Sequence, residues 1–141
     1  MYRPISASIL LLPGFDESWV VQTVGQLQAQ GCQTQTVSLK PRGVRGLYGL
    51  NVQADRVFPV ALGQTHLLIP KCKQSLPTIM IEPRIHQLVQ TVLADDGYVI
   101  VPPSVAAAFT RVGLRLPPGK RYHVVTSVEH ITELIGIENF S

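Results

Sequence analysis

Short apolar runs of strand length alternate with stretches of helical periodicity along this chain, and that alternation constrains its fold most. Residues 5–12 form an apolar run ended by a Pro-Gly pair, which is typical of a strand buried on both faces of a parallel sheet. The next segment begins after Asp16, a capping residue type, and repeats apolar residues at helical spacing from Trp19 to Leu27 before Gly31. The pattern predicts a strand followed by a helix.

The same alternation continues to the end of the chain. Further strands are predicted at residues 32–39, 65–69, 98–101 and 123–126. Further helices are predicted from Glu82 or Pro83 to residue 93, at residues 105–112 with Ser104 as the cap, and from the capping box Thr126-x-x-Glu129 to residue 135. Glycines at every third position of residues 43–52 favour a short hairpin or a tight loop over a helix. We therefore expect an α/β fold with a mostly parallel sheet and helices on both faces, whose ligands would bind beyond the carboxyl ends of the strands.

Composition restricts the class of protein. A length of 141 residues predicts a single domain, residues 1–141, and 45% hydrophobic with 15% charged residues excludes a disordered chain. No apolar run approaches the roughly 20 residues of a membrane-spanning helix, and we see no cleavable leader. We expect a soluble, cytoplasmic protein without membrane insertion.

Charge, cysteine and histidine content exclude further classes. A formal net charge of +3 without a basic stripe interleaved with aromatics makes nucleic acid an unlikely partner. Cys32 and Cys72 form neither a disulfide framework nor a metal-ligand spacing, and the four histidines have no metal-binding pattern. We predict no metal site and no cofactor.

Four landmarks follow one another in the order of a known family. They are the strand and Gly-Phe-Asp-Glu turn at residues 9–17, the glycine hairpin at 44–55, the strand Leu-Leu-Ile-Pro at 67–70, and the strand-to-helix elbow at 99–105. The chain resembles the ThiJ/PfpI family of the class I glutamine-amidotransferase-like superfamily from about residue 5 to about residue 126, and stops before the family's last strand and helix. The resemblance implies a flavodoxin-like three-layer sandwich, often dimeric, with a nucleophilic cysteine at the elbow.

The residues that the family uses for chemistry are replaced in this divergent, truncated relative. The elbow position of the nucleophile holds Pro102, and the histidine that commonly follows is Pro103. Trp19 stands where the family has the supporting acid, and the two glycines after the third strand are Lys71-Cys72. Because these positions are replaced, we expect no catalytic residue among them. We expect a non-catalytic protein that acts by protein-protein binding, as a homodimer or as a subunit or assembly factor of a larger complex.

Two alternatives remain open. Lys71 and Lys73 flank Cys72 and can lower the pKa of its thiol, which would suit a thiol-dependent or redox-sensing enzyme of the glyoxalase or deglycase kind. Arg42 and Arg45 follow the second strand as the two lysines follow the third, so the four cations can form a basic rim that binds a small anion or a nucleotide. Solvated loop charges explain the same four residues.

Overall fold

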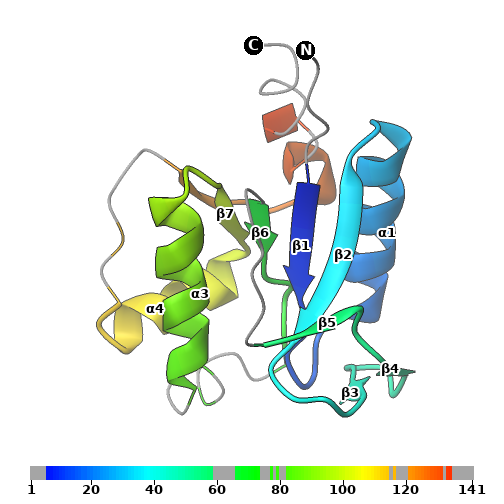
Figure 1. The fold of residues 1–141 in the computed structure, drawn as a ribbon, viewed down its shortest axis with the longest axis horizontal. Helices are drawn as coiled ribbons and strands as arrows, with labels where there is room; N and C mark the ends of the chain where they lie inside the picture. Colours follow the sequence, from blue (N-terminus) through cyan, green and yellow to red (C-terminus); the bar gives the residue numbers. More distant parts are fainter. Residues whose placement is uncertain are drawn as a thin grey trace.

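A six-stranded, all-parallel sheet forms the centre of the structure, with strand order β5-β2-β1-β6-β7-β8 (Figure 1). A computed structural model describes residues 6–58, 66–73, 77, 79, 82–114, 116, 121–131 and 133–134. The strands of the sheet are β1 (Ser6–Leu10), β2 (Gln33–Ser38), β5 (Arg56–Val57), β6 (His66–Leu68), β7 (Val99–Val101) and β8 (Tyr122–Val124). A separate antiparallel hairpin pairs β3 (Val44–Arg45) with β4 (Asn51–Val52).

The helices complete a flavodoxin-like sandwich, as expected from the sequence. They are α1 (Glu17–Ala29), α3 (Pro83–Ala94) and α4 (Pro103–Arg111), and residues 128–131 are also helical. The predicted cap of α1 is confirmed, because Oδ1 of Asp16 accepts a hydrogen bond of 3.2 Å from the Trp19 N–H. Within the described residues, no helix combines the length and apolar composition needed to cross a membrane.

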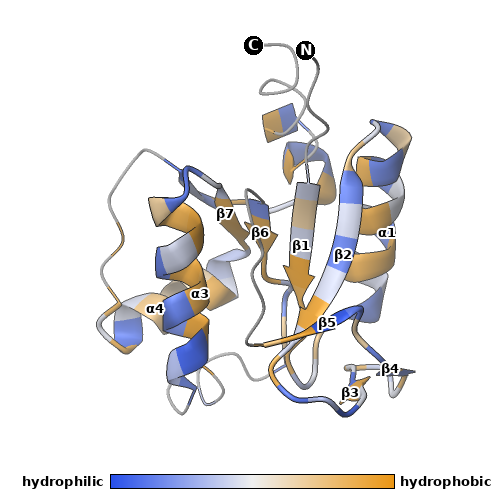
Figure 2. Cartoon of the chain, in the orientation of Figure 1, coloured by the Kyte–Doolittle hydropathy of each residue, from blue (hydrophilic) through white to orange (hydrophobic). Residues whose placement is uncertain are grey.

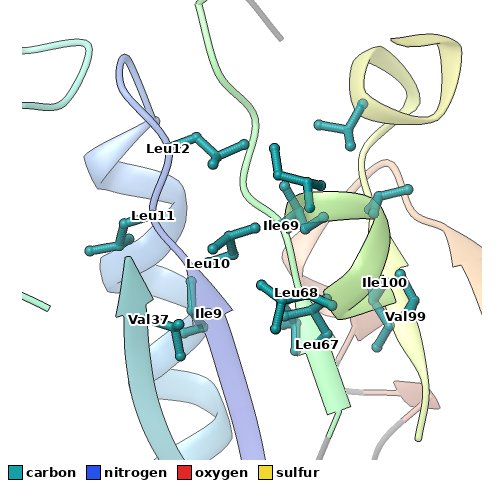
Figure 3. Packing of buried hydrophobic residues seen from close by; sticks show 14 of the residues in the cluster. Ile9, Leu10, Leu11, Leu12, Val37, Leu67, Leu68, Ile69, Val99 and Ile100 are labelled. Atoms are coloured by element: carbon teal, nitrogen blue, oxygen red, sulfur yellow. The ribbon is translucent and has the colours of Figure 1, made fainter. Parts of the chain in front are cut away.

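The core lies around the central strands because both faces of a parallel sheet are covered. All three residues of β7 and all three residues of β6 are buried, as are four of the five residues of β1. Figure 2 shows hydrophobic residues along these strands and a more polar β2. In Figure 3 the side chains of Ile9, Val37, Leu68 and Ile100 lie on neighbouring strands among other buried aliphatic residues.

The strand order places the topological switch point between β1 and β6. The chain moves from β1 outward to β2 and β5, then returns to the other side of β1 with β6 and continues to β7 and β8. Ligands of doubly wound sheets bind in the crevice beyond the carboxyl ends of such a strand pair. In Figure 1 the arrow of β1 points to the lower edge of the sheet, where the β3–β4 hairpin also lies.

Two local predictions are wrong, and one strand of the sheet was not predicted. The sequence did not predict β5, a two-residue edge strand that pairs with the end of β2. Ser104 does not cap α4, because the helix begins at Pro103 and its N-cap is Pro102. The last helix begins one residue later than its predicted capping box, since Oγ of Ser127 accepts the bond of 3.3 Å from the His130 N–H. Residue 5, residue 65 and the predicted helix end at 135 lie outside the described residues.

Candidate functional site

The turn after β1 is joined to the segment that follows β6, at the switch point. An antiparallel bridge between Phe15 and Cys72, with backbone hydrogen bonds of 2.8 and 2.9 Å, links residues 14–16 to residues 71–73. Bridge partners carry their side chains on the same side. The side chain of Phe15 is 1% exposed and that of Cys72 is 6% exposed. The chain's own backbone therefore crosses between the ends of β1 and β6, at the switch point beyond which this class of fold binds ligands.

Neither cysteine has the surroundings of a reactive thiol. The Cys72 thiol is buried and donates a hydrogen bond of 3.3 Å to the carbonyl oxygen of Pro70, although Lys71 and Lys73 beside it are exposed. Burial raises the pKa of Cys32 to about 11, so that its thiolate is scarce near neutrality. Reactive cysteines are partly exposed and lie in electropositive surroundings. The burial of Cys72 weakens the thiol-enzyme hypothesis.

The elbow between β7 and α4 is a buried proline. Pro102 has φ −75° and ψ 165°, and its carbonyl oxygen accepts hydrogen bonds of 3.1 Å from the N–H groups of Val105 and Ala106. Pro103 is the first residue of α4 and Ser104 the second, and both are exposed. Proline has no nucleophilic atom and no N–H that could stabilise an oxyanion. The elbow residue can therefore neither attack a substrate nor bind a developing negative charge.

Trp19 lies in the first turns of α1, half-buried against the hydrophobic core. Its backbone N–H donates to the carboxylate of Asp16 and so belongs to the cap of the helix. The indole brings no carboxylate to this position. Position 19, where the ThiJ/PfpI family has an acid that supports the nucleophile, therefore carries no acidic side chain in this chain.

Glu17 is a buried carboxylate to which sequence analysis assigned no role. It is 6% exposed, and its two oxygens accept hydrogen bonds of 2.9 and 3.0 Å from the Tyr48 N–H and of 3.0 Å from the Leu50 N–H. Burial alone would raise the pKa of Glu17, but backbone donors at residues 48, 50, 17 and 47 outweigh it and hold this pKa below the ordinary 4.5. An ionised Glu17 thus fastens the β3–β4 hairpin to the start of α1.

Gly46 makes room for that carboxylate. A Cβ atom at residue 46 would lie 2.3 Å from Cδ of Glu17, far inside contact distance. The turn closes with hydrogen bonds from the Gly46 N–H to the Leu50 oxygen (2.8 Å) and from the Gly49 N–H to the Gly46 oxygen (3.1 Å). Gly49 has φ +90°, which side-chain-bearing residues rarely adopt. Residues 46–50, which we call the hairpin tip, are therefore held in one conformation.

The hairpin tip exposes large apolar side chains. Tyr48 is 71% exposed, Leu50 is 59% exposed and Leu47 is 39% exposed. Nη2 of Arg45 lies 3.5 Å from the position that a Cβ on Gly49 would take, so the guanidinium adjoins the same turn. The neighbouring outer face of α1 carries no charge. Its exposed residues are Ser18, Val21, Gln22, Gly25, Gln28 and Ala29.

The four candidate anion-binding residues lie in loops at the carboxyl edge and in β3. The backbones of Arg45, Lys71 and Lys73 border residues 14–16, whereas Arg42 lies in the loop before β3. All four are exposed, and none forms an ion pair with another described residue. Among all the residues that the structure describes, no group of three or more His, Cys, Asp or Glu side chains could hold a metal ion.

A pocket of about 530 Å³ lies elsewhere, at the end of α4. It is lined by Phe109, Thr110, Gly113, Leu114, Leu116 and Tyr122. None of the residues singled out in the sequence lines it. The predicted site residues and this pocket therefore belong to different parts of the fold.

Acid should loosen the attachment of the hairpin. A carboxylate whose pKa is lower in the folded than in the unfolded state contributes stability that is present above pH 4.5 and lost as the pH falls through the folded-state pKa. We expect urea unfolding at about pH 7 to give a higher free energy of unfolding for wild type than for Glu17→Gln. This difference should shrink as the pH is lowered to about 3. Glu133→Gln, which removes an exposed carboxylate, is the control. An advantage that stays constant with pH would contradict this role of Glu17.

Comparison with known proteins identifies the fold. No protein-family model matches the chain, and no curated protein sequence does. A DJ-1 superfamily protein from Salmonella typhimurium, solved as a cysteine-to-alanine mutant, matches with a TM-score of 0.75 and 16% identity over 94% of this chain and 91% of that one. Oxidised DJ-1 from Toxoplasma gondii matches with a TM-score of 0.77 and 14% identity over 95% and 90% of the two chains. A DJ-1 superfamily protein from Agrobacterium tumefaciens matches with a TM-score of 0.74 and 14% identity over 94% and 90%.

These matches show that the chain has the fold of the DJ-1/ThiJ/PfpI superfamily. The resemblance inferred from four sequence landmarks is confirmed at the level of the fold. What the chain can do with that fold depends on its own residues at the elbow, the crevice and the hairpin tip.

Proposed function

We propose that this chain is a non-catalytic protein with the ThiJ/PfpI fold, which acts through protein-protein binding in the cytoplasm, as a homodimer or as a subunit or assembly factor of a larger complex. The observation that carries the proposal is a contrast at the carboxyl edge of the sheet. Phe15 and Cys72 pair across the switch point there and are buried, whereas the hairpin tip beside them exposes large apolar side chains.

The side chains at this edge argue against nucleophilic catalysis there. Nucleophilic catalysis needs an activated nucleophile, a base within hydrogen-bond reach and donors for the oxyanion. Pro102 supplies neither a nucleophile nor an N–H donor for the oxyanion, and Trp19 brings no carboxylate. The remaining thiol, on Cys72, is buried and hydrogen-bonded to a carbonyl oxygen. The parts required for covalent chemistry are thus not assembled among these residues.

The exposed tip supports binding. Large apolar side chains that stay in water cost free energy unless a partner covers them, and tyrosine is enriched among the residues that dominate binding energy at interfaces. Tyr48 and Leu50 are more than half exposed although their backbone N–H groups are fixed by Glu17. A surface that is already ordered loses little conformational entropy on association. This combination favours a contact surface.

Activity assays and sedimentation test the proposal together. Purified protein should show no turnover above buffer with methylglyoxal, glycated amines, amides or esters, and Cys72→Ser should give the same result. Sedimentation velocity should show a species heavier than the monomer, alone or after addition of a partner. Turnover by wild type that Cys72→Ser abolishes would refute the proposal in favour of the thiol enzyme.

A further inference from the structure

We propose that the pocket at the end of α4 binds a small, uncharged aromatic molecule whose oxygen atom accepts a hydrogen bond from the Tyr122 hydroxyl. This inference goes beyond the proposed function, because the residues that line the pocket belong neither to the hairpin tip nor to the elbow. Three features carry it. They are the size and composition of the pocket, its fixed backbone, and a tyrosine hydroxyl without a hydrogen-bond partner among the described residues.

The size and lining of the pocket suit a small aromatic molecule. Its volume is about 530 Å³. Ligand pockets typically measure about 300–1,000 Å³ and are lined mainly by apolar and aromatic side chains with a few polar groups. The rings of Phe109 and Tyr122 lie 6.4 Å apart at an angle of 44°, and two leucines complete the apolar part of the wall. Aromatic rings attract one another at centroid distances of about 4.5–7 Å, so a ligand ring can extend this pair.

The backbone around the pocket is fixed without a ligand. The N–H groups of residues 112–114 donate to carbonyl oxygens in the last turn of α4 at 3.0–3.1 Å. Tyr122 is held in β8, where it pairs with Val99 of β7. Apart from the chain neighbours of Gly113, no atom of the described residues lies within 4 Å of the position that a Cβ there would take, so this backbone borders open space. A preformed site of this kind loses little conformational entropy when a ligand enters.

The Tyr122 hydroxyl is available to a ligand. It forms no hydrogen bond with any residue that the structure describes. Burial raises the pKa of Tyr122 above its ordinary value of 10.0, so the hydroxyl keeps its proton at neutral pH and can donate. The hydroxyl of Thr110 already donates to the carbonyl oxygen of Ala106 at 3.2 Å. Among the described lining residues, Tyr122 therefore has the side-chain donor that a ligand oxygen can accept.

The lining favours an uncharged ligand. None of the six described residues that line the pocket carries a charge. Arg121, which precedes Tyr122, is paired with Asp96. Arg111 lies exposed in the last turn of α4, where a cation offsets the negative end of the helix dipole. A charged ligand would lose its hydration in the pocket without gaining an opposite charge from these six residues, and that loss is costly.

Two compounds of nearly the same shape test the inference. 1-Indanone carries a carbonyl oxygen on a ring fused to benzene, and indane has a methylene group in its place. In NMR titrations of the full chain, we expect each compound to cause saturable shifts of the backbone amides of Gly113 and Leu114. Tyr122→Phe removes only the hydroxyl, so it should weaken 1-indanone by about threefold to tenfold and change indane by less than about twofold. Tyr48→Phe, on the hairpin tip, is the matched control and should change neither.

A blocked pocket provides a second test. Thr110→Trp adds a large ring at an exposed lining position and should abolish the shifts, whereas Thr91→Trp, at an exposed position of α3, should not. The site is overturned if neither compound causes saturable shifts at Gly113 and Leu114, or if the shifts persist in Thr110→Trp. Equal effects of Tyr122→Phe on both compounds would contradict the hydrogen bond. Tighter binding of indane-1-carboxylate than of 1-indanone would contradict the uncharged ligand.

Discussion

Phe15→Ala is expected to lower the free energy of unfolding by about 3–5 kcal/mol, because it removes a fully buried aromatic ring and leaves a cavity. The cavity would form in the crevice between the ends of β1 and β6, next to the bridge partner Cys72. We therefore also expect the thiol to react with iodoacetamide faster than in wild type, where it is 6% exposed. Urea unfolding and mass spectrometry of the alkylated peptide measure the two effects.

Phe109→Ala is the matched control for this experiment. Phe109 is also 1% exposed, but it lies on α4 and not in the crevice. Its removal should cost a similar free energy of unfolding without a comparable increase in alkylation of Cys72 under native conditions. Equal alkylation in the two variants would show that global unfolding, and not an opened crevice, exposes the thiol. A Phe15→Ala variant as stable as wild type would mean that the Phe15 ring contributes little to packing beside Cys72.

Gly46→Ala should release the hairpin tip. The added methyl group would lie 2.3 Å from Cδ of Glu17, so either the carboxylate or the turn must move. Overpacking of this kind costs typically about 1–3 kcal/mol. We expect a lower urea midpoint together with faster amide hydrogen exchange at Tyr48 and Leu50, whose N–H groups then lose their acceptor.

Gly25→Ala is the control, because it replaces a glycine with alanine at a position where the added Cβ meets no other atom. Gly25 lies within α1, and nothing comes within 4 Å of a Cβ placed there. Alanine in a helix interior is more favourable than glycine by about 0.5–1 kcal/mol, so this variant should be more stable than wild type. If Gly46→Ala also stabilises the protein and leaves exchange at the tip unchanged, Glu17 does not depend on Gly46 for its position.

The central layer of the fold was predictable because its signal is local. β7 is wholly apolar, and β1 and β6 contain only Ser6, Ser8 and His66 besides apolar residues, as suits strands covered on both faces. The two-residue β5 has no such pattern, since its place is set by pairing with the end of β2. Ser104 was the wrong cap for a physical reason. The fixed φ of Pro103 and its missing N–H suit the first helical position, so α4 begins before the serine.

The candidate site was only partly predictable because its contacts join distant segments. The motif order located the elbow proline and the loop with Cys72, but the sequence does not reveal that Phe15 and Cys72 pair across the switch point. Glu17 was missed for the same reason, since its donors lie 31 and 33 residues further along the chain. The one signal in the sequence was the pair Gly46 and Gly49 in the predicted hairpin, because a glycine in a strand or turn often marks a close approach of another group.

Anchoring through main-chain groups leaves the side chains of the tip free to change. Every residue except proline supplies the N–H groups that Glu17 accepts at positions 48 and 50. Evolution, or a designer, can therefore exchange the exposed side chains at these two positions for others without disturbing the attachment of the hairpin. Related chains that keep Glu17, Gly46 and Gly49 can thus differ in the side chains that the loop presents while retaining one and the same loop conformation.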